Sequence, residues 1–258
     1  MATVDILLPG MSIGTDQALL GLATITLIRG QTNTVVDVGH YGRRGFLERA
    51  LESRGLTPDN IHTVVLTHAH WDHAGQNVEL FPNARILIHP AELEYSRSPR
   101  KGDWGTPKTL AAMLEGLNLN VREGVEGTEL EPGVSIIETH GHTRGHISVM
   151  VDTPDGTAVI AGDAVPDAGA ARRGRPHLIF WNEREAEESL RRVLGLGGII
   201  YPGHDRPFRI GPDGSAEYTG GVASLKVIAG FEQADTGAGV TIALEAIRQP
   251  FIHPEARG

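Results

Sequence analysis

The 258-residue chain contains no cysteine. Disulfide bonds, thiolate zinc sites and cysteine nucleophiles are therefore excluded. Long runs of lysine or arginine are also missing, and the formal net charge is −9 at pH 7. Because a nucleic-acid-binding protein normally presents a basic surface, this charge balance disfavours nucleic acid as a partner.

The sequence also lacks a long hydrophobic segment. No window reaches the roughly 18 apolar residues that a membrane-spanning helix needs. The first residues, MATVDILLPG, do not show the basic region and apolar stretch of a signal peptide. These absences predict a cytoplasmic location and no membrane partner. The partners that remain are a small-molecule substrate and, in a possible homodimer, a second copy of the chain.

What the sequence does contain is an alternation of short apolar runs and amphipathic segments. Runs rich in Thr, Val, Ile and Leu predict strands at 18–30, 32–39, 62–68, 83–90, 134–142, 147–153, 157–163 and 198–204. Helical periodicity predicts helices at 43–56, 90–98, 105–118 and 182–197. Such an order is typical of an α/β protein in which two sheets pack together and helices cover them outside. Since there is no linker and no short repeat, residues 1–258 are predicted to form a single domain.

Three local expectations accompany this outline. In the first helix, Phe46, Leu47, Ala50 and Leu51 should lie on one face, which the fold would bury. Thr106 should cap the third helix. Residues 211–221 should form a turn with a short hairpin, and the segments 222–232 and 240–249 should each form a helix or a strand.

The stretch LTHAHWDHAG, residues 66–75, places three histidines and an aspartate within six positions. It follows an apolar strand, and α/β proteins commonly build their sites at the carboxyl ends of strands. In extended backbone alternate side chains share a face, so His68 and His70 can hold one metal ion. Asp72 and His73 lie further round the turn and can reach a second ion. Imidazole and carboxylate ligands together suit zinc, manganese, iron or cobalt.

More metal-binding side chains occur at later strand ends. Each follows an apolar run and sits in a turn that contains glycine, where the backbone can approach an ion closely. They are His140, His142 and His146 in ETHGHTRGH, Asp163 in IAGDAV and His204 in YPGHD. One more histidine for each ion and one shared carboxylate would complete a site for two divalent cations.

These motifs resemble those of the metallo-β-lactamase superfamily, in its glyoxalase II and N-acyl homoserine lactonase branches. The resemblance extends from about residue 34 to 210 and comprises VVDVG, THAHWDHAG, GHTRGH, AGD and PGHD in the family's order. It implies an αββα sandwich of two mixed β-sheets flanked by helices, with two divalent metal ions at one edge. Zn²⁺ is the first expectation for these ions, and iron, manganese and cobalt are the alternatives.

The resemblance also implies a role for each motif residue. His68, His70 and His142 would bind the first metal, Asp72, His73 and His204 the second, and Asp163 would bridge them. Asp37 would support the ligands from behind, and His146 is expected to form a hydrogen bond there as well. The catalytic candidates are Asp72 and His204, and Asp72 would carry a proton to the leaving group.

The implied activity is hydrolysis of small carbonyl esters by a hydroxide shared between the two ions, with a lactone ring as the first choice of substrate. Lactonases often carry a tyrosine shortly after the bridging aspartate, whereas this chain reads AVPD at 164–167. The 48 residues after Ile210 are few for the glutathione-binding domain of glyoxalase II. The alternatives are a glyoxalase II-like thioesterase, a β-lactamase, an iron persulfide dioxygenase and a non-catalytic metal-binding protein.

Three side chains outside the motifs are candidates for substrate contact. His177 and Trp181 follow Asp163 in a segment that tends to border the pocket. Met11 lies in the loop before the strand at 18–30, which could reach over the same pocket. The other histidines are expected to be structural or to lie at the surface or at strand ends; they are His40, His62, His89, His140 and His253.

Overall fold

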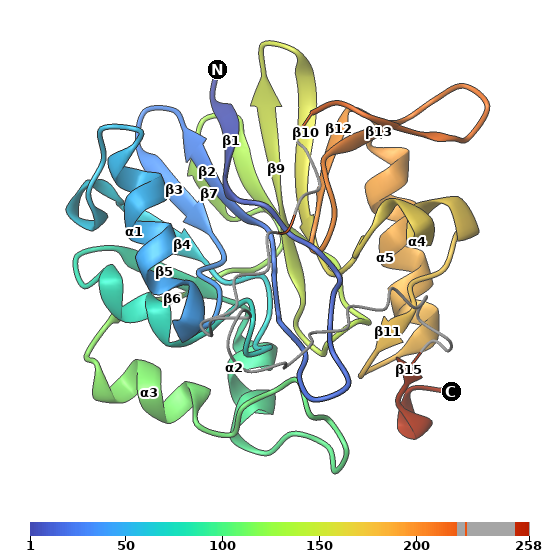
Figure 1. Cartoon of the computed structure of the whole chain (residues 1–258), viewed down its shortest axis with the longest axis horizontal. Coiled ribbons are helices and arrows are strands. Elements are labelled where there is room, and N and C mark those ends of the chain that lie inside the picture. The colour runs from blue at the N-terminus through green and yellow to red at the C-terminus, as the bar shows by residue number, and fades with distance from the viewer. Residues whose placement is uncertain (221–224, 226–250, 258) are drawn as a thin grey trace, which may run out of the picture.

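The computed structural model of the chain describes residues 1–220, 225 and 251–257. Two mixed sheets pack face to face, and helices cover both outer faces (Figure 1). The layers follow the order α, β, β, α, so the predicted αββα sandwich is confirmed. The segments predicted as a helix or strand at 222–232 and 240–249 lie, apart from residue 225, outside the described residues.

The first sheet has six strands in the order β1-β2-β3-β4-β5-β6. The strands β1 to β3 pair antiparallel, and β3 to β6 pair parallel. Their bounds are β1 Thr3–Leu8, β2 Ile25–Arg29, β3 Asn33–Val36, β4 Thr63–Val65, β5 Arg85–Ile88 and β6 Asn120–Glu123. The helices α1 (Arg44–Glu52), α2 (Pro90–Arg97) and α3 (Leu110–Gly116) lie in the crossovers that parallel pairing requires.

The second sheet has seven strands in the order β14-β13-β12-β10-β9-β8-β7. Their bounds are β7 Glu129–Glu131, β8 Val134–Glu138, β9 Ile147–Thr153, β10 Gly156–Gly162, β12 Ile199–Pro202, β13 Phe208–Ile210 and β14 Ala216–Tyr218. The helices α4 (Ala168–Arg173) and α5 (Glu183–Gly195) cover its outer face (Figure 1). A short parallel pair is formed by β11 (Leu178–Ile179) and β15 (Phe251–Ile252).

The alternation of side chains along the strands builds separate apolar layers. In β4, Val64 packs under α1 and α3, whereas Val65 packs against the second sheet. Ile136 and Val149 meet Val65 from the other side. Each fully buried aliphatic side chain of this kind contributes about 1.5–3 kcal/mol. The two layers therefore hold the strand ends of both sheets in fixed positions.

Two local expectations were wrong. Phe46 is 59% exposed, because α1 buries the stripe of Leu47 and Leu51 and a neighbouring position points about 100° away from it. Helix α3 begins only at Leu110, and Thr106 does not cap it. The Thr106 hydroxyl instead donates to Asp103 Oδ2 over 2.9 Å.

Of two other expectations, one is confirmed and one is confirmed in part. The strands β13 and β14 form an antiparallel hairpin around the turn predicted at 211–221. The strand predicted at 18–30 is shorter, and only Ile25–Arg29 belongs to the sheet.

Among the described residues, no helix has both the length and the apolar character that crossing a bilayer requires.

Candidate metal centre

The seven predicted ligands come together at one edge of the sandwich. They follow the ends of β4, β8, β10 and β12, so both sheets contribute to the site. One group holds His68, His70, His142 and Asp163, and the other holds Asp72, His73 and His204. In each group the ligand atoms lie within 4.8 Å of one another.

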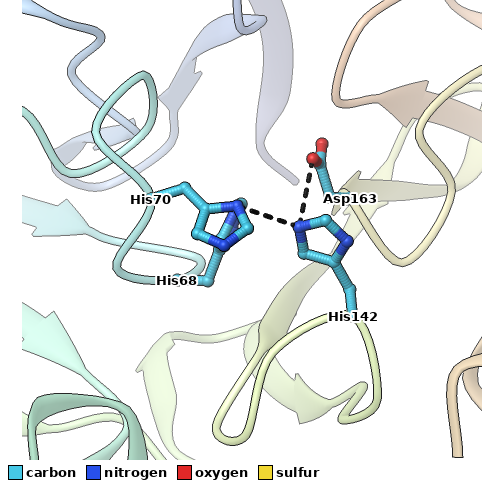
Figure 2. Close-up of side chains that lie close together, drawn as sticks. All are labelled: His68, His70, His142 and Asp163. Carbon is cyan, nitrogen blue, oxygen red and sulfur yellow. Dashed lines mark hydrogen bonds and ion pairs between the residues drawn. The ribbon is translucent and has the colours of Figure 1, made fainter. Parts of the chain in front are cut away.

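The first group has the spacing of a metal site. His70 Nδ1 lies 3.1 Å from His142 Nε2, which lies 3.3 Å from Asp163 Oδ2 (Figure 2). For metal–ligand bonds of about 2.0–2.1 Å, tetrahedral ligands stand about 3.3 Å apart. His68 Nε2 is buried and has no hydrogen-bond partner among the described residues. A cation at the centre of this group would satisfy it.

The second group is joined to the first by one carboxylate. His73 Nε2 and His204 Nε2 are 3.3 Å apart, and each lies 3.4 Å from Asp163 Oδ1. Asp72 Oδ2 lies 3.6 Å from His204 Nε2. Asp163 therefore turns one oxygen toward each group, which is the arrangement that a bridging ligand needs.

The hydrogen bonds behind the ligands select the nitrogen that each ring presents. The Nδ1 atoms of four ligand histidines face oxygen acceptors. These pairs are His68 with Thr67 Oγ1 at 2.9 Å, His73 with Asp37 Oδ2 at 2.7 Å, His142 with the Leu178 carbonyl at 2.8 Å and His204 with the Leu22 carbonyl at 3.2 Å. Each ring therefore carries its proton on Nδ1 and turns the Nε2 lone pair to the centre, as metal-binding histidines do. The donor set fits two divalent cations.

Asp37 supports both groups from behind. Its carboxylate accepts hydrogen bonds from the Thr67 N–H at 2.8 Å and from His73 Nδ1 at 2.7 Å, and it also binds the Thr67 hydroxyl. Thr67 in turn accepts from His68, so one aspartate orients a ligand of each metal position. Its backbone has φ +59°, which a residue other than glycine rarely adopts.

The Asp37→Ala variant should therefore lose metal and activity together. We expect a fall of about 10–100-fold in metal affinity or activity, because His73 and Thr67 lose the acceptor that orients them. Metal analysis and kcat/KM on the same preparation measure this. Asp155→Ala, in the exposed β9–β10 turn, is the control. Equal metal content and activity in the two variants would contradict the role of Asp37.

The electrostatics of the two groups differ. Burial lowers the pKa of His68 well below its ordinary value, lowers that of His142, and lowers that of His70 to about 3. Burial also opposes protonation of His73 and His204, but Asp163 raises the pKa of both above its usual range. Burial thus keeps the rings of the first position neutral, whereas a cation at the second position must first displace the protons that Asp163 favours on His73 and His204.

His146 lies behind the centre and is not placed to bind an ion. Its Nε2 accepts the Asp163 N–H at 3.0 Å, and its Nδ1 lies 2.9 Å from Thr139 Oγ1. Both nitrogens are therefore occupied. The ring holds the backbone of the bridging aspartate in place.

Two buried carboxylates near the centre were missed by the sequence reasoning. Glu92 lies in the first turn of α2, and Asp103 lies in the loop that follows this helix. Asp103 Oδ1 is 3.9 Å from His70 Nε2 and is held by the N–H groups of Gly105 and Thr106. Aspartate and glutamate side chains usually face water, so the sequence carried no sign of either role.

The candidates for substrate contact lie in different places. The Met11 N–H donates to the carbonyl of Leu22, which also accepts from His204, so Met11 lies beside the second group. His177 is buried, and its Nδ1 lies 3.5 Å from Asp167 Oδ2.

Trp181 does not join the metal groups. It packs on the Arg100 guanidinium, 3.9 Å from the ring centre, and lines a separate cavity of about 490 Å³. The preceding residue, Phe180, faces His70 and His142 with ring centres 4.6 and 5.6 Å apart. Of these two neighbours, Phe180 is therefore the one that packs against the first ligand group, and the substrate contact of Trp181 stays a prediction.

A third histidine–carboxylate group, His89, Glu138 and His140, lines that same cavity. His89 Nδ1 accepts the Ala91 N–H at the start of α2, so its proton is on Nε2, which donates to Glu138 Oε1 over 3.2 Å. A ring with both nitrogens used in this way has no lone pair for a metal. His40 and His253 accept N–H groups two residues ahead in the same manner. His40, His89 and His253 therefore each cap the start of a helix.

The comparisons with known proteins agree with this geometry. The model of the metallo-beta-lactamase superfamily matches residues 19–204. The chain is 31% identical over 211 residues to metallo-beta-lactamase domain-containing protein 1 of Xenopus laevis, which covers 81% of this chain and 82% of the frog protein. It is 31% identical over 160 residues to an N-acyl homoserine lactonase of Bacillus sp, which covers 60% of each chain.

Solved structures show the same fold. The dizinc quorum-quenching lactonase AidC superposes with a TM-score of 0.62 at 16% identity, over 79% of this chain and 80% of AidC. A quorum-quenching N-acyl homoserine lactone lactonase superposes with a TM-score of 0.60 at 22% identity, over 78% and 91% of the two chains.

The chain therefore belongs to the metallo-β-lactamase superfamily. It is related there to metallo-beta-lactamase domain-containing protein 1 and to the N-acyl homoserine lactonases. Its fold and its buried histidine–aspartate cluster are those of a metal-dependent hydrolase.

Proposed function

We propose that the protein is a dinuclear zinc hydrolase of small carbonyl esters and that it opens a lactone ring. The observation that carries the proposal is Asp163, which turns one oxygen toward each of two buried ligand groups. The relative from Bacillus sp that is named a lactonase supports the choice of substrate, and the dizinc neighbour supports the choice of metal.

Two bound ions would supply Lewis acidity, which lowers the pKa of a water and polarises a carbonyl. The chain's own residues orient and protect this chemistry. Asp72 lies at the second group, 3.6 Å from His204, and is the carboxylate placed to pass a proton to the leaving oxygen. Phe180 shields His70 and His142 from water. No serine or cysteine nucleophile is needed for this route, and the chain has no cysteine.

His177 is the side chain that we place at the substrate in the absence of the lactonase tyrosine. Residues 164–167 end in Asp167, which caps α4 and lies next to His177. Burial lowers the pKa of His177, so the ring is neutral at pH 7 and can donate a hydrogen bond to a carbonyl.

The His177→Ala variant should lose about tenfold in kcat/KM, because the substrate loses one hydrogen bond in a site shielded from water. Its metal content should stay unchanged. His62→Ala, at an exposed histidine before β4, is the control. The measurement is kcat/KM of both variants on the best substrate. Equal values for the two variants would show that His177 does not contact the substrate.

One experiment tests the proposed function as a whole. Lactones, aryl esters, acyl thioesters and nitrocefin are assayed side by side on protein whose metal content has been measured, and oxygen consumption is followed with glutathione persulfide. Two zinc ions per chain and fastest hydrolysis of a lactone are expected. Faster hydrolysis of a thioester or of nitrocefin, or oxygen consumption, would replace the lactonase by the corresponding enzyme. Two bound ions with no turnover would indicate a non-catalytic metal-binding protein.

A further inference from the structure

Glu92 is a fully buried carboxylate behind the first metal position. Its Oε1 accepts the Ala69 N–H at 2.9 Å, and its Oε2 accepts the Gly145 N–H at 2.7 Å. In the part of the chain that the structure describes, no lysine or arginine pairs with it, and burial raises its pKa. Burying a carboxylate without a cation is costly. A carboxylate buried at this cost is expected to have a specific structural or functional role.

The two N–H groups belong to the two loops that supply the histidines of the first position. Ala69 lies between His68 and His70 and follows β4 of the first sheet. Gly145 lies three residues after His142, in the turn between β8 and β9 of the second sheet. A single side chain of α2 thus ties together two loops that come from different sheets.

The glycine at position 145 is explained by this contact. A Cβ added there would lie 2.5 Å from the Glu92 backbone nitrogen and 2.8 Å from His89 Nδ1, which is too close for either atom. From the sequence, a glycine beside a ligand was expected to allow a close approach between backbone and ion. At Gly145 the close approach is to the start of α2 instead.

We propose that Glu92 is a positioning residue that sets how tightly the first position holds its ion. His70 Nδ1 and His142 Nε2 stand 3.1 Å apart although they come from separate loops. The Ile147 N–H joins these loops at the Thr67 carbonyl, and the Glu92 carboxylate adds a second link next to the histidines themselves. Without the carboxylate, two buried N–H groups lose their acceptor and the loops can separate. The inference rests on the metal centre and is independent of which substrate the protein hydrolyses.

The test compares Glu92→Gln with Glu131→Gln. The glutamine at position 92 keeps the size of the side chain but turns an NH₂ group toward one of the two N–H donors. Glu131 is a matched control, because its carboxylate also accepts two backbone N–H groups, from Gln31 at 3.0 Å and Thr32 at 2.8 Å. It joins β7 to the turn between β2 and β3, and none of its hydrogen bonds goes to a ligand loop.

The readout is the release of Zn²⁺ from the purified zinc-loaded protein to a chromogenic chelator, with a thermal melt of each variant. Both variants should melt at lower temperature. Only Glu92→Gln should release one of its two ions at least about tenfold faster than the unsubstituted chain. Release at the unsubstituted rate, or equal acceleration in Glu131→Gln, would overturn the proposal.

A second variant serves if Glu92→Gln does not fold. Gly145→Ala keeps the carboxylate but forces the β8–β9 turn away from α2. It should release one ion faster in the same assay, and unchanged release would reject the role of the contact. No substrate enters either measurement, so failure of the lactonase proposal would leave this result unaffected.

Discussion

The Asp163→Ala variant is expected to lose at least about 10³-fold in kcat/KM while its fold persists. Removing one group that stabilises transition-state charge already costs about 10²–10³-fold in comparable sites. Asp163 contributes an oxygen to both groups, so its loss affects both ions at once. The bond from the Asp163 N–H to His146 is made by the backbone and remains in the variant.

Kinetics on the best ester, metal analysis and circular dichroism of the same preparation test this expectation. Asp163→Asn keeps one oxygen and should retain more metal than the alanine variant. Asp152→Ala, at an exposed position on β9, is the control for a lost negative charge. Near-normal turnover of Asp163→Ala with two ions bound would show that the ligand assignment is wrong.

Removal of the metal ions is expected to abolish activity and to destabilise the protein. The nitrogens of His70 and His142, and those of His73 and His204, face each other at 3.1 and 3.3 Å, and cations between them would stabilise the folded state. A ligand present at about 1,000 times its Kd stabilises by about 4 kcal/mol. For a chain of this size, that corresponds to a shift in Tm of roughly 10 °C.

A chelator titration followed by a thermal melt and an ester assay measures both effects. Addition of Zn²⁺ to the stripped protein should restore activity and Tm together, whereas addition of Mg²⁺, which prefers oxygen ligands, should restore neither. Full activity in protein shown to contain no cation would end the dinuclear interpretation.

The identity of the ligands could be predicted because the chemistry is concentrated in short motifs. Three histidines and an aspartate within residues 68–73 have few roles other than metal binding, and the apolar runs before each motif place it at a strand end. The same alternation of strands and helices predicts two packed sheets with outer helices. These patterns are local, so they can be read without knowing how the chain folds back on itself.

Helix boundaries and the directions of individual side chains could be predicted less well from the sequence. Phe46 and Trp181 each stand next to a buried residue, and a shift of one position decides which of the two neighbours faces the core or the site. Asp103 explains why Thr106 does not cap α3, and the sequence does not show that these two residues bond to each other.

What the sequence determined by itself is the set of groups able to bind metal and the class of fold that carries them. Only the tertiary structure decided how those groups are used: Asp163 shared between two positions, Asp37 and Thr67 orienting the rings, and Glu92 joining the loops. These contacts connect residues as far apart in the chain as His204 and Leu22 or His142 and His70. They form only when two separately built sheets pack against each other, and no local periodicity encodes that meeting.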